Sequence, residues 1–159
     1  MMQGERETEM YEQLLLGMLL IMTTVLVHGM SLDRLIQFLA RIWPTFKTNL
    51  VGHGKPLFLS ITVLGVFLAH VMEIWIWALV FLWTGEVRNL ESALYFSTVT
   101  FTTVGYGDVI LSEQWRMLGS VESANGMLLF GWSTAFIFEV MRRVWDLDSK
   151  QADAEERSV

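Results

Sequence analysis

The chain has 159 residues, of which 53% are hydrophobic and 18% are charged, and its formal net charge is −6. Its length is typical of one domain, and its apolar residues gather in long blocks, which indicates membrane-spanning helices. The absence of cysteine excludes disulfides, thiol catalysis and thiolate metal sites, and the absence of a basic stripe argues against nucleic-acid binding.

The first third of the chain contains three predicted segments. Residues 1–12 form an acidic tail, and residues 13–32 contain no Asp, Glu, Lys or Arg, which is long enough for one spanning helix. A cleaved signal peptide is the alternative, but an acidic start and a poor cleavage site disfavour it. Residues 33–55 interleave apolar and basic side chains at helical spacing, so they fit either an amphipathic helix in the membrane interface or a plain linker. Pro44 should end or bend such a helix.

The rest of the chain contains two more predicted spans with a shorter helix between them. Residues 56–84 are long enough to cross a membrane with tilt. Asn89 is a candidate N-cap for a helix over 90–102, which is too short to span. Residues 115–143 form the last spanning helix, and residues 144–159 form an acidic, solvated tail.

The strongest functional signal lies between the short helix and the last span. Residues 102–108 read Thr-Thr-Val-Gly-Tyr-Gly-Asp, with a glycine on either side of Tyr106. Glycine adopts backbone conformations closed to other residues, so this run can align successive carbonyl oxygens toward a cation that has shed its water. An ordinary tight turn is the alternative. A turn would not need the Thr-Thr-Val sequence, and non-helical backbone at membrane depth must be buried or line a cavity.

This stretch resembles the selectivity filter of the tetrameric potassium channel family, of the bacterial two-helix pore-loop type. Residues 93–97 and Asp108 resemble the pore helix and outer mouth of that family, and the resemblance covers residues 56–143. It implies an all-α membrane protein with three transmembrane helices, a re-entrant pore helix and a filter loop in each of four identical chains. The helix over 13–32 is an addition to the two-helix pattern.

The resemblance assigns three sets of residues. The filter, with K⁺ as the transported ion bound at its first four residues, consists of Thr103, Val104, Gly105, Tyr106 and Gly107. The residues that support the filter are Tyr95, Phe96, Thr102 and Asp108. The residues that line the cavity and the gate are Gly126, Met127, Phe130, Gly131, Thr134 and Phe138. Gly126 matches the hinge position of the family, although glycine in an apolar helix equally serves close packing.

Ionisable side chains inside the predicted spans are costly in lipid and are therefore functional candidates. They are His70, Glu73, Glu122 and Glu139. His70 and Glu73 share a helix face, and helix rise brings Glu73 to the depth of Asn125, with Glu122 one turn further out. His70, Glu73, Glu122 and Asn125 therefore form either a proton-sensing network or a structural network that holds the outer helix to the inner one.

Val99 is a departure from the family pattern. Some bacterial members carry a carboxylate at this position that pairs with the aspartate after the filter, so Asp108 needs another partner here. The inactivation behaviour of the filter stays open for the same reason. The first helix lacks the series of Arg or Lys that a voltage sensor needs, whereas gating by protons, lipid or tension, and a constitutive leak, stay open.

The expected function is passive, potassium-selective conduction through a homotetramer. The alternatives are a weakly selective cation channel and a non-conducting transporter subunit or regulator. No enzyme activity is expected, because the sequence contains no Ser/His/Asp set and no metal-ligand motif. Expected partners are other copies of the chain and membrane lipids, with no nucleic acid.

Charge bias predicts the orientation in the membrane, which we expect to be a bacterial inner membrane. Cytoplasmic segments carry an excess of Lys and Arg. With residues 33–55 and the C-terminus in the cytoplasm, eight of the 11 basic residues lie inside. The N-terminus and the mouth of the filter then lie outside.

Overall fold

The computed structural model describes residues 2–49 and 54–156, which form four helices and no strand. The helices are α1 (Met2–Asn49), α2 (Gly54–Trp83), α3 (Leu90–Phe101) and α4 (Arg116–Glu156). Three of them contain a segment long and apolar enough to cross a membrane, and these segments are Met10–Phe46, Gly54–Trp83 and Arg116–Asp146. The predicted fold class, an all-α membrane protein with three spanning helices, is confirmed.

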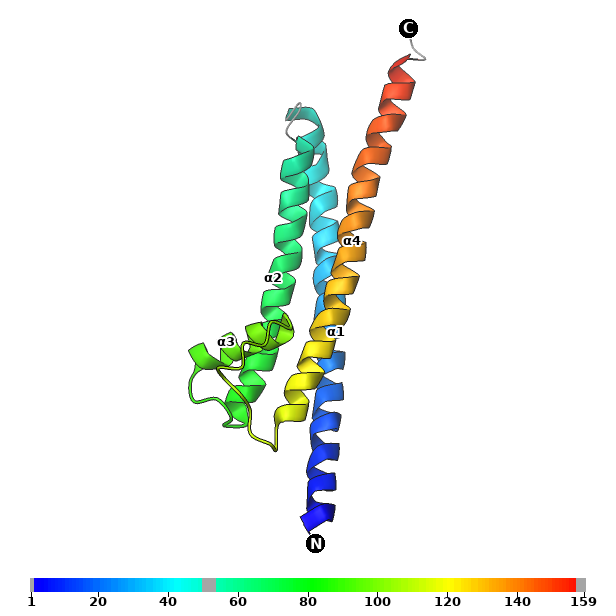
Figure 1. Cartoon of the computed structure of the whole chain (residues 1–159). Coiled ribbons are helices and arrows are strands. Elements are labelled where there is room, and N and C mark those ends of the chain that lie inside the picture. The colour runs from blue at the N-terminus through cyan, green and yellow to red at the C-terminus, as the bar shows by residue number, and fades with distance from the viewer. Residues whose placement is uncertain (1, 50–53, 157–159) are drawn as a thin grey trace.

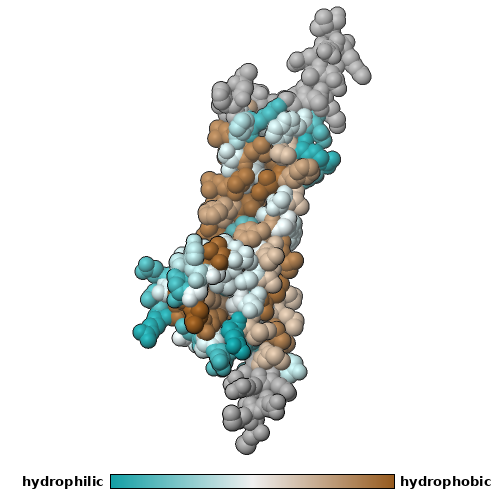
Figure 2. All heavy atoms as spheres, in the orientation of Figure 1, coloured by the Kyte–Doolittle hydropathy of each residue, from teal (hydrophilic) through white to brown (hydrophobic). Residues whose placement is uncertain are grey.

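Three long helices form the body of the molecule. α1, α2 and α4 lie side by side, and α3 with its flanking loops lies at one end of α2 (Figure 1). The chain runs along the bundle three times, so its two termini lie at opposite ends. Hydrophobic side chains cover the middle of the bundle, and hydrophilic ones gather over α3 and its loops (Figure 2). This distribution suits a bundle whose middle is surrounded by lipid.

α1 is a single helix over Met2–Asn49, where the sequence indicated a tail, a spanning helix and a separate interfacial segment. Pro44 lies inside this helix, so of the two predicted effects, an end or a bend, the helix does not end there. Proline removes one backbone hydrogen bond, but tertiary packing offsets that loss. The rings of Trp43 and Phe46 pack edge-on against Phe58 of α2, with centroids 5.0 and 5.8 Å away. These contacts hold the last turns of α1 against the start of α2.

α1 also packs closely against the other two long helices through glycines. A Cβ atom at Gly17 would lie 2.9 Å from Val121 Cγ1 of α4. A Cβ atom at Gly65 of α2 would lie 2.5 Å from Leu35 Cδ1 of α1. Small residues let membrane helices approach closely, so α1 is an integral part of the bundle of its own chain.

α4 continues well beyond the predicted end of the last span. Residues 144–156, predicted as part of a solvated tail, extend the helix to Glu156. They include no glycine or proline, and several are good helix formers. Val144 is buried in a cluster with Leu39 and Phe58, which joins α4 to α1 and α2 at this end of the bundle. The residues outside the described part of the chain are residue 1 of the predicted N-terminal tail, 50–53 of the predicted interfacial helix or linker, and 157–159 of the predicted C-terminal tail.

The short helix α3 begins as predicted. The Oδ1 atom of Asn89 accepts a hydrogen bond from the backbone N–H of Ser92 at 2.9 Å, which satisfies one of the free amides of the first turn. Glu91 lies in that turn, where a carboxylate complements the helix dipole. The prediction of an Asn89 N-cap is therefore confirmed.

α3 runs back along α2 toward the middle of the bundle. Near its centre, the ring of Phe96 meets Phe81 of α2 with centroids 5.0 Å apart. Phe101 lies at the end of α3. Its ring centroid is 6.0 Å from that of His70, which lies nearer than Phe81 to the start of α2. The loop that follows α3 therefore starts deep in the bundle and returns to the end from which α3 came, where α4 begins (Figure 1).

Candidate functional site

After α3, the sign of the backbone φ angle alternates from one residue to the next. Thr103, Gly105 and Gly107 have φ angles of 60°, 56° and 77°, whereas Val104 and Tyr106 between them do not have positive φ. Thr103 is the one non-glycine residue with positive φ among those described. A β-branched residue in this region is strained, typically by about 1–3 kcal/mol. Such strain persists only where the surrounding structure imposes the conformation.

Hydrogen bonds to α3 fix the direction of these peptide groups. The N–H of Thr103 donates to the carbonyl of Thr100 at 3.0 Å. The N–H groups of Val104 and Gly105 both donate to the carbonyl of Val99, at 3.0 and 3.3 Å. In a trans peptide unit the carbonyl points opposite to the N–H, and the described residues contain no cis peptide bond. The carbonyls of Thr103 and Val104 therefore point away from α3.

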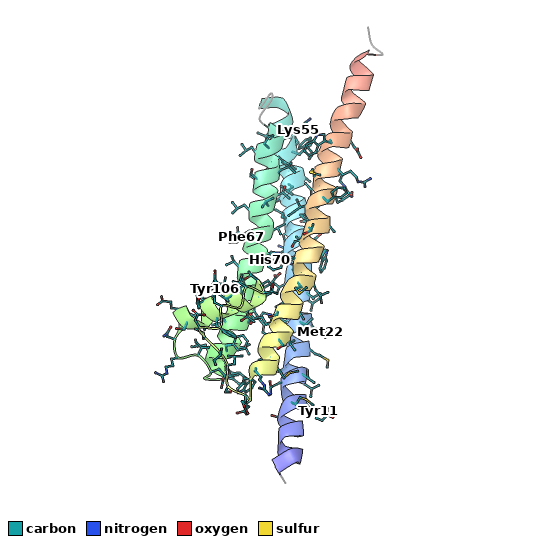
Figure 3. All side chains as sticks on the ribbon, in the orientation of Figure 1. Tyr11, Met22, Lys55, Phe67, His70 and Tyr106 are labelled. Carbon is teal, nitrogen blue, oxygen red and sulfur yellow. The ribbon has the colours of Figure 1, made fainter. Side chains whose placement is uncertain are left out.

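The side of the loop that faces away from α3 is open in the single chain. The residues Val104 and Tyr106 are 53% and 72% exposed. A Cβ atom at Gly105 or Gly107 would meet no atom within 4 Å. Figure 3 shows Tyr106 on this loop, beside α3. One chain thus presents the carbonyls of Thr103 and Val104 without surrounding whatever they bind.

Asp108 finds its partner on α3. The hydroxyl of Tyr95 donates to Asp108 Oδ2 at 2.7 Å, and the backbone N–H of Val109 donates to Asp108 Oδ1 at 3.1 Å. Tyr95 therefore supplies the contact that Val99 cannot make. The hydrogen bond from Tyr95 lowers the pKa of Asp108 below its ordinary value, because it stabilises the carboxylate, and the same bond raises the pKa of Tyr95.

Removal of this hydrogen bond should change the titration of Asp108. In Tyr95→Phe, we expect the pKa of the Asp108 carboxyl to rise toward its ordinary value, because the bond that favours the ionised form is lost. The wild-type bond is therefore present above the pKa of Asp108 and is lost as the pH falls through it. Carboxyl ¹³C NMR titration of labelled aspartate measures the shift. Tyr11→Phe is the control, and an unchanged Asp108 titration in Tyr95→Phe would contradict the assignment.

Gly126 lies against the end of α3. A Cβ atom at this position would lie 2.0 Å from the carbonyl oxygen of Phe101 and 3.2 Å from its Cγ. A Cβ atom at Gly131 would meet no atom within 4 Å. Of the two interpretations of Gly126, the structure supports close packing, because only glycine lets α4 approach the last turn of α3 this closely.

The other predicted cavity residues divide between an open and a packed environment. Met127, Thr134 and Phe138 are exposed in the single chain. Phe130 is half-buried instead, with its ring centroid 4.7 Å from that of His70. The exposed residues remain candidates for a cavity lining, whereas Phe130 packs toward the core of its own chain.

The predicted ionisable network is only partly present. His70 Nδ1 lies 2.8 Å from Glu73 Oε2, as their shared helix face predicts. The other oxygen, Oε1, lies 2.7 Å from Nδ1 of His28, and Asn125 Nδ2 donates to Thr24 Oγ1 at 2.7 Å. The predicted contact between Glu73 and Asn125 is therefore wrong. α1 lies against both helices at this depth and supplies His28 to Glu73 and Thr24 to Asn125.

Glu122 belongs to a different contact. Its Oε1 atom is hydrogen-bonded to the hydroxyl of Ser97, which also lies 3.0 Å from the carbonyl oxygen of Ile74. Both side chains are fully buried. Glu122 thus joins α4 to α3 and α2, behind the loop that carries the open carbonyls, and it does not join Glu73.

Several polar residues at these contacts escaped the sequence analysis, most clearly those on α1. Thr24 and His28 are fully buried although they lie in an apolar helix. They are four residues apart and therefore share a helix face. That spacing could have indicated a polar face of this helix, because polar residues in a spanning helix usually face other helices.

Comparison with known proteins agrees with this geometry. The ion channel family model matches residues 69–143, which extend from the middle of α2 through α3 and the open carbonyl loop into α4. No curated protein and no solved structure matches the chain significantly. Residues 69–143 of this membrane protein are therefore similar to the ion channel family, a pore-loop family that includes potassium channels.

Proposed function

We propose that the protein is a potassium-selective channel that conducts K⁺ passively. The observation that carries the proposal is the alternating backbone over residues 103–107, in which the first three amides bond to α3 and the carbonyls of Thr103 and Val104 point the other way. Backbone carbonyls in this arrangement replace the hydration shell of K⁺ in selectivity filters. The ion channel family match supports conduction, and the filter sequence supports the choice of K⁺.

Four identical chains complete the pore. A single row of carbonyls cannot surround an ion, and closed rotational symmetry is the usual way for identical chains to form a ring. Each K⁺ is then bound by oxygens of Thr103, Val104, Gly105 or Tyr106 from four chains. The C-terminal end of α3 carries the negative end of its helix dipole, which favours a cation beneath the filter.

The remaining assignments concern the orientation of the tetramer and the lining of its pore. The N-terminus and the mouth of the filter face outward, and the C-terminus lies in the cytoplasm of a bacterial cell. Residues 56–143 form the pore unit, with α3 and the filter loop re-entering the membrane from outside. Met127, Thr134 and Phe138 line the cavity and the inner gate, and their exposure in the single chain supports this assignment.

Ion flux through purified protein in liposomes tests the proposal. We expect barium-sensitive K⁺ flux that greatly exceeds Na⁺ flux, because the carbonyl oxygens of such filters replace the hydration shell of K⁺. Protein-free liposomes are the control. Equal K⁺ and Na⁺ flux would replace this proposal with a weakly selective cation channel, and the absence of flux would favour a non-conducting transporter subunit or regulator.

A further inference from the structure

A closed ring of four buried polar side chains lies within the bundle. It consists of His28 from α1, His70 and Glu73 from α2, and Ser133 from α4. The two oxygens of Glu73 lie 2.7 and 2.8 Å from the Nδ1 atoms of His28 and His70. The Oγ atom of Ser133 lies 2.9 and 3.2 Å from Nε2 of His70 and His28. Figure 3 shows His70 about midway along α2.

We infer that this four-residue ring is a proton-binding site. Four hydrogen bonds need four hydrogens. An ionised Glu73, two neutral imidazoles and one serine hydroxyl supply three, because each neutral imidazole carries one N–H and the carboxylate carries none. One bound proton supplies the fourth. We place it on an imidazole, which becomes an imidazolium, because imidazole is a stronger base than a carboxylate. The proton comes from water, and no bond other than an N–H bond is formed.

The charges in the ring favour the same composition. With the bound proton, the ring contains one carboxylate and one imidazolium and is neutral. Without it, the ring is a buried anion, since His28, His70, Glu73 and Ser133 are all at most 7% exposed. A buried charge is costly unless it is paired.

Aromatic rings surround the two imidazoles. The ring centroid of Phe130 lies 4.7 Å from that of His70, and that of Trp132 lies 5.2 Å from that of His28. The faces of aromatic rings attract cations within about 6 Å. Both candidate positions of the imidazolium therefore have an aromatic neighbour. This support for an imidazolium does not depend on the number of hydrogens in the ring.

The spacing of the ring favours a proton over a metal ion. The same two histidines and Glu73 are a donor set that metals use. Donors bonded to Zn²⁺ at about 2.0–2.1 Å in a tetrahedron lie more than 3 Å apart. The nitrogen–oxygen separations of 2.7 and 2.8 Å are those of charge-assisted hydrogen bonds.

No other charged group is in contact with the ring among the described residues. α3 contributes Phe101, whose ring faces His70 and does not ionise. The nearest ionisable residues along α1, α2 and α4 are Asp33, Arg34, Lys55, Glu122, Glu139, Arg142 and Arg143. Of these, Glu139 is paired with both arginines and Glu122 is bonded to Ser97. The charge of the ring is therefore balanced within the ring, and loss of its proton weakens the link that joins α1 to α2 and α4.

Histidine NMR tests this inference without reference to ion conduction. The chain has three histidines, so a His53→Gln background leaves only the two in the ring. In ¹⁵N-labelled protein near neutral pH, we expect the signature of one imidazolium shared by the pair. In Glu73→Gln, the amide N–H supplies the fourth hydrogen, so the ring stays closed and both imidazoles become neutral. Glu122→Gln is the matched control and should leave the imidazolium signal unchanged.

A second readout separates a bound proton from a bound metal ion. Added zinc should leave the histidine signals unchanged. Two neutral imidazoles in the wild type, an imidazolium that survives in Glu73→Gln, or binding of one zinc per chain with loss of the Nδ1 protons would each overturn the inference.

Discussion

Replacement of Gly105 by alanine is expected to abolish selective K⁺ flux, whereas the same replacement at Gly85 leaves it intact. Gly105 has a φ of 56° and Gly85 has a φ of 79°, and a Cβ atom at either would meet no atom within 4 Å. The left-handed conformation costs an alanine roughly 1–2 kcal/mol at both positions. The strain energy is therefore similar in the two variants. They differ in whether the strained peptide groups carry proposed filter oxygens.

At Gly105 the strain acts on the carbonyl row itself. Relaxation of φ to a negative value rotates the peptide groups on either side, so the oxygens of Val104 and Gly105 leave the row. In the proposed tetramer this happens four times around the same ion path. Gly85 follows α2, and its relaxation moves no proposed filter oxygen.

Barium-sensitive K⁺ and Na⁺ flux in liposomes measures the difference. Both variants should first be shown by size-exclusion chromatography to assemble like the wild type. A wild-type ratio of K⁺ to Na⁺ flux in assembled Gly105→Ala would contradict the proposed role of this carbonyl row.

The second large effect is expected at Gly126. A Cβ atom there would lie 2.0 Å from the carbonyl oxygen of Phe101, which belongs to the backbone of α3 and cannot turn aside. α4 must then move away from the end of α3. We expect Gly126→Ala to lower the free energy of unfolding by about 3 kcal/mol or more, at the upper end of overpacking costs.

Gly131 provides the matched control on the same helix. A Cβ atom at Gly131 meets no atom within 4 Å, and alanine favours a helix by about 1 kcal/mol over glycine. Gly131→Ala should therefore be neutral or slightly stabilising in thermal unfolding. Equal stability of the two variants would mean that α4 does not approach α3 as closely as the structure indicates.

The features that the sequence predicted well are those that neighbouring residues determine. The Asn89 cap depends on a side chain and an amide three residues away, and the apolar runs of the three spans are continuous. The carbonyl loop is likewise read from seven consecutive residues. Local chemistry dominates in each case.

The features that the sequence did not predict depend on packing between distant segments. Pro44 stays inside α1 because of aromatic contacts with Phe58. His28 and Glu73 are 45 positions apart, and His28 and Ser133 are 105 apart. Helix rise gives a depth along an axis, but it does not say which other helix lies between two side chains. For that reason, the sequence predicted a contact between Glu73 and Asn125. In the structure, each of the two contacts a side chain of α1 instead.

The length of α1 has a mechanical consequence. Its 48 residues make a rod about 72 Å long, well beyond the thickness of a bilayer. His28 is near its middle, where the four-residue ring fastens it to α2 and α4. Gly17 and Trp43 contact the other helices on opposite sides of that point. A rod that is held at three depths cannot pivot by itself, so a displacement of either end of α1 is shared with α2 and α4 along the whole bundle.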